Sequence, residues 1–426
     1  MSDDNHRPMD PAIWRGLTQP RVTRRDAIRV GGSMGLAAFL AACGVSGTTK
    51  SASNGVGTAA WWDKQKLHHK VNFGNWPLYL DVYKGTHPTL EHFTKETGIQ
   101  VTYTEPIQDN IPFYTKIRPA LQAHQYTGYD IIVMTNNSPA LGFLKEFGWL
   151  VPLDHRMMVN FKKNAGPLVT NPSWDPGNKY TMAWQSGWTA LAYNSKVIKE
   201  PIDSVQALYD PKYSGKIGMM ADPQELGSNG LLALGIEPAK STPADWKRAQ
   251  AKLKAQQPHV RHYYDQDYIN ALKNGDTVIS MAWSGDIFQA NLNSQYKDLK
   301  FVFPKEGAMS WTDNMCIPQG VQNPKDAMTL MDYYFRPDVQ AVVEYYLDYV
   351  CPVPSAKNVL LHPSGWAAET LKKMEPSIGE PASVTAKAPT VFPNSHVVSL
   401  SKPYYQYKGQ AQLTAWNNLF VPITQG

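Results

Sequence analysis

The feature that most restricts the fold of this chain is a regular alternation of short apolar runs and helical segments early in the sequence. Its elements are expected as a strand around 71–73, a helix over 87–97, a strand over 98–104, a helix over 111–124 and a strand over 129–134. The last run, Tyr-Asp-Ile-Ile-Val-Met, is apolar in the manner of a buried parallel strand. Strand, helix, strand, helix and strand in this order predict an α/β unit with a parallel sheet.

Ligands of open α/β sheets bind beyond the carboxyl ends of the strands. Residues 75–79 follow the first expected strand, and residues 135–137 follow the third. These two segments are therefore expected at the edge of the sheet where a ligand would bind.

Length and composition describe a soluble protein of two or three domains. The chain has 426 residues, of which 42% are hydrophobic and 18% are charged. Its formal net charge of +5 is small for this length and includes no basic block of the kind that binds nucleic acid. We therefore expect no nucleic-acid partner.

Residues 1–43 have the layout of a bacterial signal peptide. A basic segment ends in Thr-Arg-Arg, an uncharged apolar run spans residues 30–42, and Leu-Ala-Ala-Cys closes the run at Cys43. The run is too short to cross a membrane, which takes about 20 residues. Its ending resembles a lipobox, which implies cleavage before Cys43 and lipid attachment to the thiol. The arginine pair resembles a twin-arginine signal, but Ala27 replaces the phenylalanine usual after the pair, so the export route stays open.

Residues 44–69 are expected to form a flexible tether, because they begin with a run of Ser, Thr, Gly and Ala and end in a polar, basic stretch. The adjacent His68 and His69 lie there without a cluster of further ligands, so we expect no metal site at this pair.

Beyond the lipobox the chain has two cysteines, Cys316 and Cys351. In an oxidising compartment two thiols without a third are candidates for a disulfide. The sequence alone does not show that they meet.

A candidate binding segment follows the apolar run at 299–304, which is expected to be a strand. Trp311 and Asp313 are two residues apart, and in an extended segment this spacing places both side chains on one face. A flat aromatic ring beside a carboxylate suits a cation with an apolar body. The alternative is a tryptophan packed in the core beside an aspartate that caps a turn, and these residues alone do not decide between the two.

Asp222 and Glu225 stand where an expected strand over 216–220 passes into a helix. An aspartate before a proline, with a glutamate three residues on, is a good helix N-terminus, which explains both acids structurally. The alternative is that both carboxylates face a cleft. Another expected strand, over 277–283, ends in a tryptophan before a Ser-Gly pair.

Four short motifs occur along the chain in a recognisable order. They are Asn-Trp-x-x-Tyr at 75–79, Asp-Pro-x-Glu at 222–225, Met-x-Trp-Ser-Gly at 281–285 and Pro-Lys-Glu-Gly-Ala-x-x-Trp-x-Asp at 304–313. In order and spacing they resemble the periplasmic polyamine-binding proteins of ABC importers, of the spermidine/putrescine type. The resemblance covers roughly residues 70–355, and about the last seventy residues match poorly.

This resemblance implies an α/β, two-lobed periplasmic-binding-protein fold, type II-like, with crossing hinge strands and a ligand cleft between the lobes. The first lobe would comprise residues 70–185 and 310–356. The second would comprise residues 186–309 and the C-terminal helices over 357–426.

The same resemblance implies a role for each matching residue. The residues that it places in the site are Trp76 and Tyr79 for the first-lobe wall, Asp222 and Glu225 for one amine, Trp283 for the methylene chain, and Trp311 and Asp313 for another amine. A polyamine is a set of ammonium groups on an aliphatic rod, so its burial requires carboxylates for the charges and aromatic faces for the methylenes. Asp265 stands at a usually neutral polar position, and a fourth acid favours a more highly charged amine.

Two positions depart from the family pattern. Cys351 stands where the family has an aromatic residue before Pro-x-Pro, and Thr-Asn-Asn at 135–137 replaces a more aromatic loop. These departures leave open whether the ligand is spermidine or putrescine, while the retained acids still favour a cation.

The sequence therefore predicts an extracytoplasmic, lipid-anchored protein that captures a polyamine and delivers it to the permease and ATPase subunits of an ABC importer. We expect a monomer without catalysis, cofactor or metal. One alternative is a ferric-ion-binding relative of the same fold, for which Tyr263-Tyr264 is a candidate pair of ligands. Another is an exported enzyme, but the sequence shows no Cys/His ligand cluster, phosphate loop or nucleophile motif outside the leader.

Overall fold

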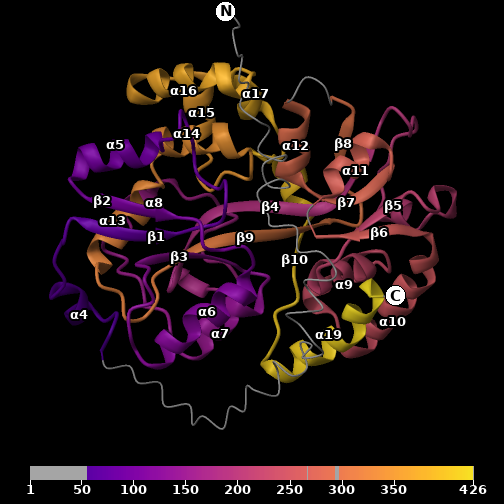
Figure 1. Cartoon of the computed structure of the whole chain (residues 1–426), viewed down its shortest axis with the longest axis horizontal. Coiled ribbons are helices and arrows are strands. Elements are labelled where there is room, and N and C mark those ends of the chain that lie inside the picture. The colour runs from indigo at the N-terminus through magenta and orange to yellow at the C-terminus, as the bar shows by residue number, and fades with distance from the viewer. Residues whose placement is uncertain (1–54, 266, 293–296, 426) are drawn as a thin grey trace, which may run out of the picture.

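The computed structural model describes residues 55–265, 267–292 and 297–425. The expected signal peptide, Cys43 and the first part of the expected tether lie outside these residues. The described chain forms two lobes that share one continuous sheet (Figure 1).

The sheet runs through both lobes in the order β2-β1-β3-β9-β4-β7-β5-β6, with β10 beside β9 and β8 beside β4. Its strands are β1 (Lys70–Gly74), β2 (Gln100–Thr104), β3 (Ile131–Thr135), β4 (Thr181–Asn194), β5 (Ile217–Met220), β6 (Val260–Tyr264), β7 (Ile279–Trp283), β8 (Leu299–Val302), β9 (Ala308–Cys316) and β10 (Ser401–Pro403). β1 pairs in parallel with β2 and β3, as the early alternation predicted. β4 and β9 are antiparallel neighbours at the centre and carry the chain between the lobes.

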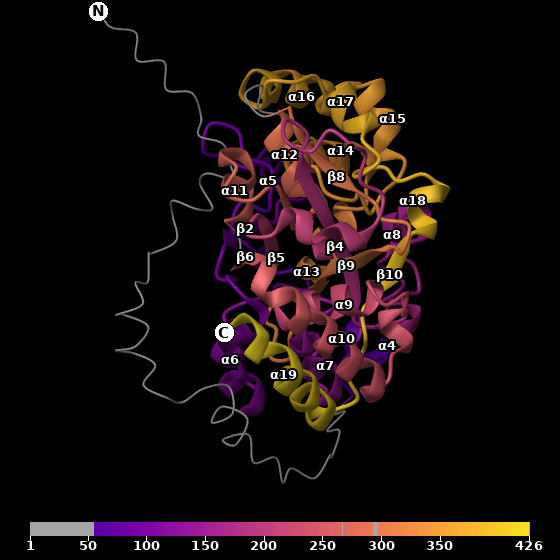
Figure 2. The ribbon, with the colours of Figure 1, turned by 90° about the vertical axis from the view of Figure 1, so that its right-hand side faces the viewer.

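Helices cover both faces of the sheet in each lobe (Figures 1 and 2). The helices of the first lobe are α4 (Ala59–Asp63), α5 (Pro88–Thr97), α6 (Asn110–Gln122), α7 (Pro139–Glu146), α8 (Val159–Asn164), α13 (Pro324–Tyr333), α14 (Pro337–Leu347), α15 (Ala356–Leu361), α16 (Gly365–Ile378) and α17 (Ala382–Lys387). The remaining helices are α9 (Pro223–Leu232), α10 (Pro243–Gln256), α11 (Tyr268–Asn274), α12 (Ser284–Leu292), α18 (Ser395–Ser399) and α19 (Gln410–Thr424). Short 3-10 turns lie at Pro176–Asn178, Val205–Tyr209, Pro211–Tyr213, Pro238–Lys240 and Gln257–His259.

Each lobe has its own hydrophobic core. Phe73 and Trp184 are buried in the first-lobe core, and Trp246 and Leu253 are buried in the second-lobe core. Full burial of a large apolar side chain contributes about 1.5–3 kcal/mol, so each lobe is stabilised largely by its own core. The two-lobed α/β fold predicted from the sequence is confirmed.

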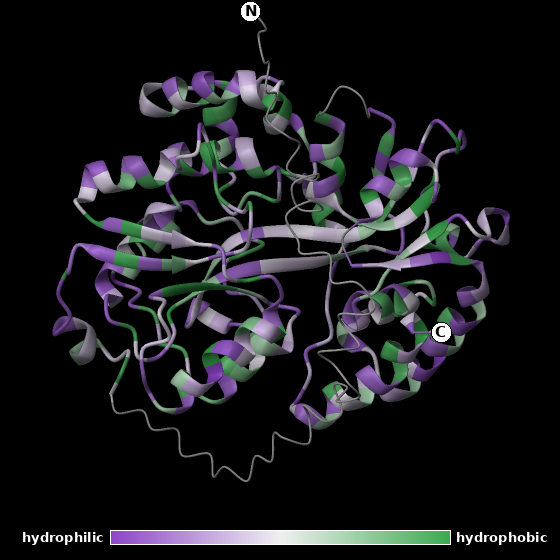
Figure 3. Cartoon of the chain, in the orientation of Figure 1, coloured by the Kyte–Doolittle hydropathy of each residue, from purple (hydrophilic) through white to green (hydrophobic). Residues whose placement is uncertain are grey.

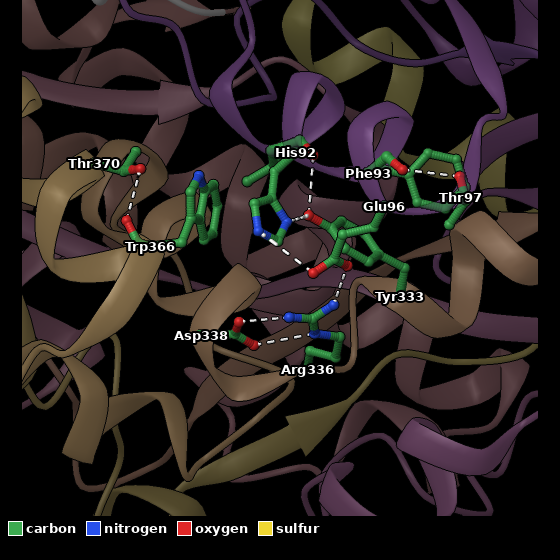
Figure 4. A network of polar contacts seen from close by, with 10 residues as sticks. His92, Phe93, Glu96, Thr97, Tyr333, Arg336, Asp338, Trp366 and Thr370 are labelled. Carbon is green, nitrogen blue, oxygen red and sulfur yellow. Dashed lines mark hydrogen bonds and ion pairs between the residues drawn. The ribbon is translucent and has the colours of Figure 1, made fainter.

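The C-terminal helices divide between the lobes, which corrects the assignment of residues 357–426 to the second lobe. α15, α16 and α17 lie with α14 at one end of the molecule (Figures 1 and 2), and Leu371 and Met374 of α16 join the first-lobe core. Figure 4 shows α16 against α5, where the rings of Trp366 and His92 have centroids 4.0 Å apart. The apolar face of α16 therefore belongs to the first lobe.

α19 completes the second lobe instead. Trp416 and Phe420 are fully buried in the second-lobe core. Gly227 on α9 makes room for the indole, because a Cβ there would lie 2.3 Å from the Trp416 ring. The Trp416 indole N–H also donates to the carbonyl oxygen of Pro223 at 2.9 Å. The last helix is thus packed on the N-terminal turn of α9.

The expected tether over residues 44–69 is wrong for its last part, because residues 59–63 form α4. Trp62 is 1% exposed, and its indole N–H donates to the carbonyl oxygen of Pro152 at 3.0 Å. The Thr58 side chain caps the helix N-terminus. Two consecutive tryptophans supply enough apolar surface to offset the entropy of ordering this segment.

The crossing strands β4 and β9 are almost entirely buried, yet their hydropathy is intermediate (Figure 3). Their buried polar side chains include Gln185, Ser186, Thr189, Thr312, Asp313 and Asn314. Burying a polar group costs free energy unless hydrogen bonds replace its water. A concentration of such groups where the lobes join therefore marks this region as the candidate site.

Candidate ligand-binding site

The first carboxylate of the candidate site, Asp313, lies on β9 and pairs in register with Thr135 at the carboxyl end of β3. Its Oδ2 accepts a hydrogen bond from the Tyr79 hydroxyl at 2.8 Å, and its Oδ1 accepts one from Thr135 Oγ1 at 2.7 Å. The side chain is 6% exposed. Burial raises the pKa of Asp313 to about 6, although both hydrogen bonds act to lower it.

Within the described residues Asp313 accepts hydrogen bonds from neutral hydroxyl groups, and no lysine or arginine there influences its pKa. A buried carboxylate is stabilised most by a positive partner. The geometry therefore suits an incoming ammonium group.

Aromatic rings lie beside this carboxylate. The ring centroids of Trp311 and Tyr349 are 5.5 Å apart at 60°, and those of Tyr79 and Tyr349 are 5.7 Å apart at 89°. Gly187 on β4 provides the space, since a Cβ there would lie 2.3 Å from the Trp311 ring. The indole N–H groups of Trp76 and Trp311 are buried without a hydrogen-bond partner in the described chain. Of these two groups, the Trp311 indole N–H lies in the ring cluster beside Asp313 and is a hydrogen-bond donor that a ligand can use.

The second pair of carboxylates lies at the N-terminus of α9 in the other lobe. Asp222 is the N-cap residue, and its Oδ1 accepts from the Glu225 backbone N–H at 2.9 Å. Glu225 is 4% exposed and accepts from Thr189 Oγ1 at 3.0 Å and from the Tyr404 hydroxyl at 2.7 Å. Burial, and next the charge of Asp222, raises the pKa of Glu225 to about 8.

The helix-capping interpretation of the acid pair is confirmed, and the cleft interpretation stays a prediction. Asp222 caps the helix, and its side chain is also exposed while protein surrounds it on most sides, as expected on the wall of a cleft. Burial is the largest cause of its raised pKa, and the charges of Asp109 and Asp265 add to it. Asp109 caps α6 in the first lobe, so it lies near Asp222 across the junction of the lobes.

Trp283 stands at the end of β7, half-buried, with its ring 5.9 Å from that of Tyr268 in an edge-to-face contact. A hydrogen bond from Trp283 is one of the causes that lower the pKa of Glu225. Trp283 therefore lies beside the second-lobe acids, and its contact with the methylene chain of a ligand stays a prediction. Asp265 is exposed directly after the end of β6, and its charge helps to raise the pKa of Asp222.

A cavity of about 690 Å³ opens between the lobes, and its lining includes none of the acids and aromatic residues described above. It lies between α7 of the first lobe and the segment before α19 of the second, and its lining includes Asn136, Asn137, Trp174, Tyr180, Tyr405 and Tyr407. Tyr407 is close enough to Asp222 for the two groups to interact electrostatically. The cavity therefore adjoins the second-lobe acids.

Residues 89–373 match the bacterial extracellular solute-binding protein family. The chain belongs to this family. The solute-binding protein is 29% identical to the spermidine/putrescine-binding periplasmic protein of Salmonella typhimurium. The 289 aligned residues cover 68% of this chain and 79% of that relative. The chain is 29% identical over 353 residues to the putrescine-binding periplasmic protein PotF of Escherichia coli, which covers 78% of this chain and 87% of the relative.

The fold is similar to that of a spermidine/putrescine ABC transporter substrate-binding protein, PotD, from Streptococcus pneumoniae. The TM-score is 0.68 at 24% sequence identity, over 84% of this chain and 98% of that one. Membership of the family confirms the predicted substrate-binding role. Within the described ranges, no helix combines the length and apolar character needed to cross a bilayer.

The predicted candidate disulfide of the solute-binding protein is wrong, because Cys316 and Cys351 are both free and buried. The Cys316 thiol lies 3.4 Å from the carbonyl oxygen of Asn314, and the Cys351 thiol lies 3.1 Å from that of Val353. Burial raises the pKa of each thiol. Each thiol donates to a backbone carbonyl oxygen two residues away, and the two cysteines are not bonded to each other.

The ferric-ion alternative finds no support in the geometry of Tyr263 and Tyr264. Both lie on β6, where consecutive side chains point to opposite faces. Adjacent strand residues therefore do not converge on one metal ion. In the described part of the chain, no group of three or more His, Cys, Asp or Glu side chains is arranged to bind a metal.

Four residues of the candidate site were not predicted from the sequence. They are Asp109, Thr189, Tyr349 and Tyr404. Thr135 was expected at the edge of the sheet where a ligand would bind, and it lies there at the carboxyl end of β3, bonded to Asp313. Tyr404 lies in the C-terminal part that matched the family poorly, so no motif pointed to it.

Proposed function

We propose that this solute-binding protein captures a linear polyamine, of the spermidine or putrescine kind, and delivers it to an ABC importer. The observation that carries the proposal is the pair of buried acidic centres, Asp313 in one lobe and Glu225 in the other, each bound by neutral hydroxyls. Two such centres with aromatic rings beside them match two ammonium groups joined by methylenes. The names of the relatives, which bind spermidine or putrescine, support the same ligand class.

Each end of the amine would pair with one acidic centre. Asp313 would meet one ammonium group while Tyr79 and Thr135 orient the carboxylate, and Glu225 with Asp222 would meet the other. Desolvating an ammonium group is costly unless a carboxylate and hydrogen bonds replace the water. These two centres provide both.

The aromatic residues would bury the chain between the ammonium groups. Trp283 and Trp311 would contact the methylenes, and Trp76 and Tyr79 would close the first-lobe wall. A cation beside an aromatic face gains about 0.5–2 kcal/mol. Asp265, with its charge near Asp222, would favour a ligand with a third ammonium group.

The remaining parts of the proposal concern the cellular setting. Lipid attachment at Cys43 would hold the mature monomer at the outer face of the cell membrane, next to the permease, with the ATPase subunits on the other side. Binding without catalysis requires no cofactor or metal. Mass spectrometry of the protein from its host tests the anchor: a diacylglyceryl group on an N-terminal Cys43 supports it, and an unmodified N-terminus contradicts it.

Titration calorimetry with spermidine, putrescine, and neutral and anionic solutes tests the ligand class. A ligand at a hundred times its Kd stabilises the folded state by about 2.7 kcal/mol, so a thermal shift provides an independent check. Binding of a polyamine but not of 1,4-butanediol supports the proposal. No binding of any polyamine at millimolar concentration would contradict it.

A further inference from the structure

The segment that follows α4 is fixed against the first lobe at both of its ends. At its start, the Trp62 side chain is buried and its indole N–H donates to a backbone carbonyl oxygen. At its end, the His68 backbone N–H donates to Asp326 Oδ2 at 2.9 Å, and the His68 ring Nδ1 lies 3.1 Å from the carbonyl oxygen of Gln322. Side chains between these two points therefore project from a defined place on the first lobe.

The side chains that project from this segment are basic and apolar. Lys64 and Lys66 are exposed, and within the described residues neither forms an ion pair. Leu67 beside them is 45% exposed. The segment thus presents two free positive charges and an aliphatic side chain to the surroundings.

A second exposed segment of the same character lies next to the first. Arg156 pairs with Asp63 of α4 at 2.9 Å, and α8 begins three residues later. On α8, Val159 is 64% exposed, and Lys162 and Lys163 are exposed on the same face of the helix, three and four residues on. Neither of these lysines has an ion-pair partner in the part of the chain that the structure describes.

These two segments together form a surface that we call the basic patch, made of Lys64, Lys66, Leu67, Val159, Lys162 and Lys163. Three large hydrophobic side chains are exposed in the described chain, and the patch contains two of them. A single exposed aliphatic side chain is common on a protein surface, but here each one stands beside two unpaired lysines. Basic groups pair with anionic lipid headgroups, and aliphatic side chains enter the boundary between headgroups and acyl chains. The composition of the patch therefore fits an anionic bilayer.

The position of the patch in the chain favours the same partner. α4 lies at the outer edge of the first lobe (Figure 1). Eleven residues, 44–54, separate the expected lipid site at Cys43 from the described chain. Even fully extended, such a segment spans at most about 40 Å. A lipid on Cys43 would therefore keep the patch close to the bilayer and raise its effective concentration there.

We propose that the basic patch docks the first lobe on the anionic lipid surface of the membrane. The lipid on Cys43 would hold the protein at the membrane, so the contribution of the patch is the orientation of the first lobe. The geometric part of this argument rests on the proposed anchor at Cys43. Mass spectrometry measures the anchor and vesicle binding measures the patch, so the two can fail independently.

Vesicle co-sedimentation of the mature chain with Cys43→Ser measures the patch without a lipid. Vesicles of equal parts phosphatidylglycerol and phosphatidylcholine supply the anionic surface, and vesicles of phosphatidylcholine alone supply a neutral one. We expect binding to the anionic vesicles that weakens as salt is added, and no binding to the neutral ones. Each basic side chain near an anionic surface changes partitioning by about fivefold. Lys64→Gln, Lys66→Gln and Leu67→Ser together should therefore weaken binding by at least about 25-fold.

The second lobe offers a matched control. Val197 is 56% exposed, and the exposed Lys196 and Lys199 flank it. Lys196→Gln, Val197→Ser and Lys199→Gln together remove the same number of charges and one aliphatic side chain, far from α4 in the sequence. Lys196 pairs with Asp298 in an exposed ion pair, and such pairs contribute little to stability. The control variant should bind anionic vesicles as its parent does, and both triple variants should melt at the temperature of the parent.

Each outcome decides for or against the patch. A 25-fold loss in the patch variant, with parental binding in the control variant, supports the inference. Equal loss in both variants overturns it, because net charge alone then accounts for the binding. Absence of binding to anionic vesicles also overturns it, and a dimer that the patch variant abolishes would assign the surface to a second copy of the chain. Protein that binds anionic vesicles but no polyamine would contradict the proposed function alone.

Discussion

Polyamine binding is expected to release close to one proton at pH 7, with Glu225 as the source. Burial, and next the charge of Asp222, raises the pKa of Glu225 to about 8. At pH 7, about nine-tenths of the empty protein would therefore carry a proton on Glu225. An ammonium group pairs with the ionised carboxylate, so this proton leaves as the ligand binds. Asp313, whose pKa is raised to about 6, would add about a tenth of a proton.

The same numbers set the pH dependence of affinity. Between pH 6 and pH 8 the affinity should rise by about a hundredfold, of which about fiftyfold comes from Glu225 and about twofold from Asp313. Glu225→Gln removes the larger contribution, so its affinity, lower at every pH, should change by about twofold over the same range. The contrast lies in the slope, which a general loss of binding does not imitate.

Calorimetry in buffers of different ionisation enthalpy measures the number of protons released. Wild-type protein at pH 7 should release about one, and Glu225→Gln about a tenth. Equal proton release by the two proteins, or no proton release by the wild type, would show that Glu225 is not the source of the proton.

The raised pKa also predicts how the empty protein responds to pH. Between the ordinary glutamate pKa of 4.5 and about 8, the folded state binds the proton more tightly than the unfolded state. The stabilisation is therefore fully present below about pH 4.5 and is lost as pH rises through 8, by on the order of 5 kcal/mol. Denaturant melts of wild type and Glu225→Gln should show a steeper decline in the wild type, because burial also raises the pKa of Asp313 to about 6 and of Glu344 and Asp348 to about 8 in both proteins.

Three further changes test separate parts of the site. Asp313→Asn should weaken polyamine binding by more than about tenfold in calorimetry, since an ammonium group loses its buried partner, and an unchanged Kd would remove Asp313 from the site. Gly187→Ala should displace Trp311 and cost about 1–3 kcal/mol of stability in denaturant melts, whereas Gly142→Ala, where a Cβ meets no atom within 4 Å, should not. Thiol titration of unfolded, unreduced protein that lacks Cys43 should find two reactive thiols, and none would mean that a disulfide forms.

The fold was predictable because local patterns and tertiary packing agree in it. The alternation between residues 71 and 134 gave strands and helices close to their observed bounds. The composition of the segment around Trp62 wrongly indicated a flexible tether, because the Ser- and Gly-rich run before this buried tryptophan resembles a linker. The lobe assignment of the C-terminal helices was wrong for a different reason. The amphipathic pattern of α16 does not specify which lobe its apolar face meets.

The site was predictable where one residue has one local signal. Trp311 and Asp313 share an extended strand, and both are buried beside the cation-suited wall, as the two-residue spacing indicated. Asp222 fulfils the helix-capping signal, and this task leaves its carboxylate available for the proposed site. Tyr404 meets Glu225 only through a tertiary contact across 179 residues of chain, and Tyr349 meets Tyr79 and Trp311 through ring contacts between distant segments. No local spacing reveals either contact.

The most direct test of the central claim is a crystal structure of the mature protein grown with spermidine. We expect one ammonium group within hydrogen-bond distance of Asp313, another within reach of Glu225 or Asp222, and methylenes against Trp283 and Trp311. A polyamine bound elsewhere, or bound without contact to either acidic centre, would contradict it.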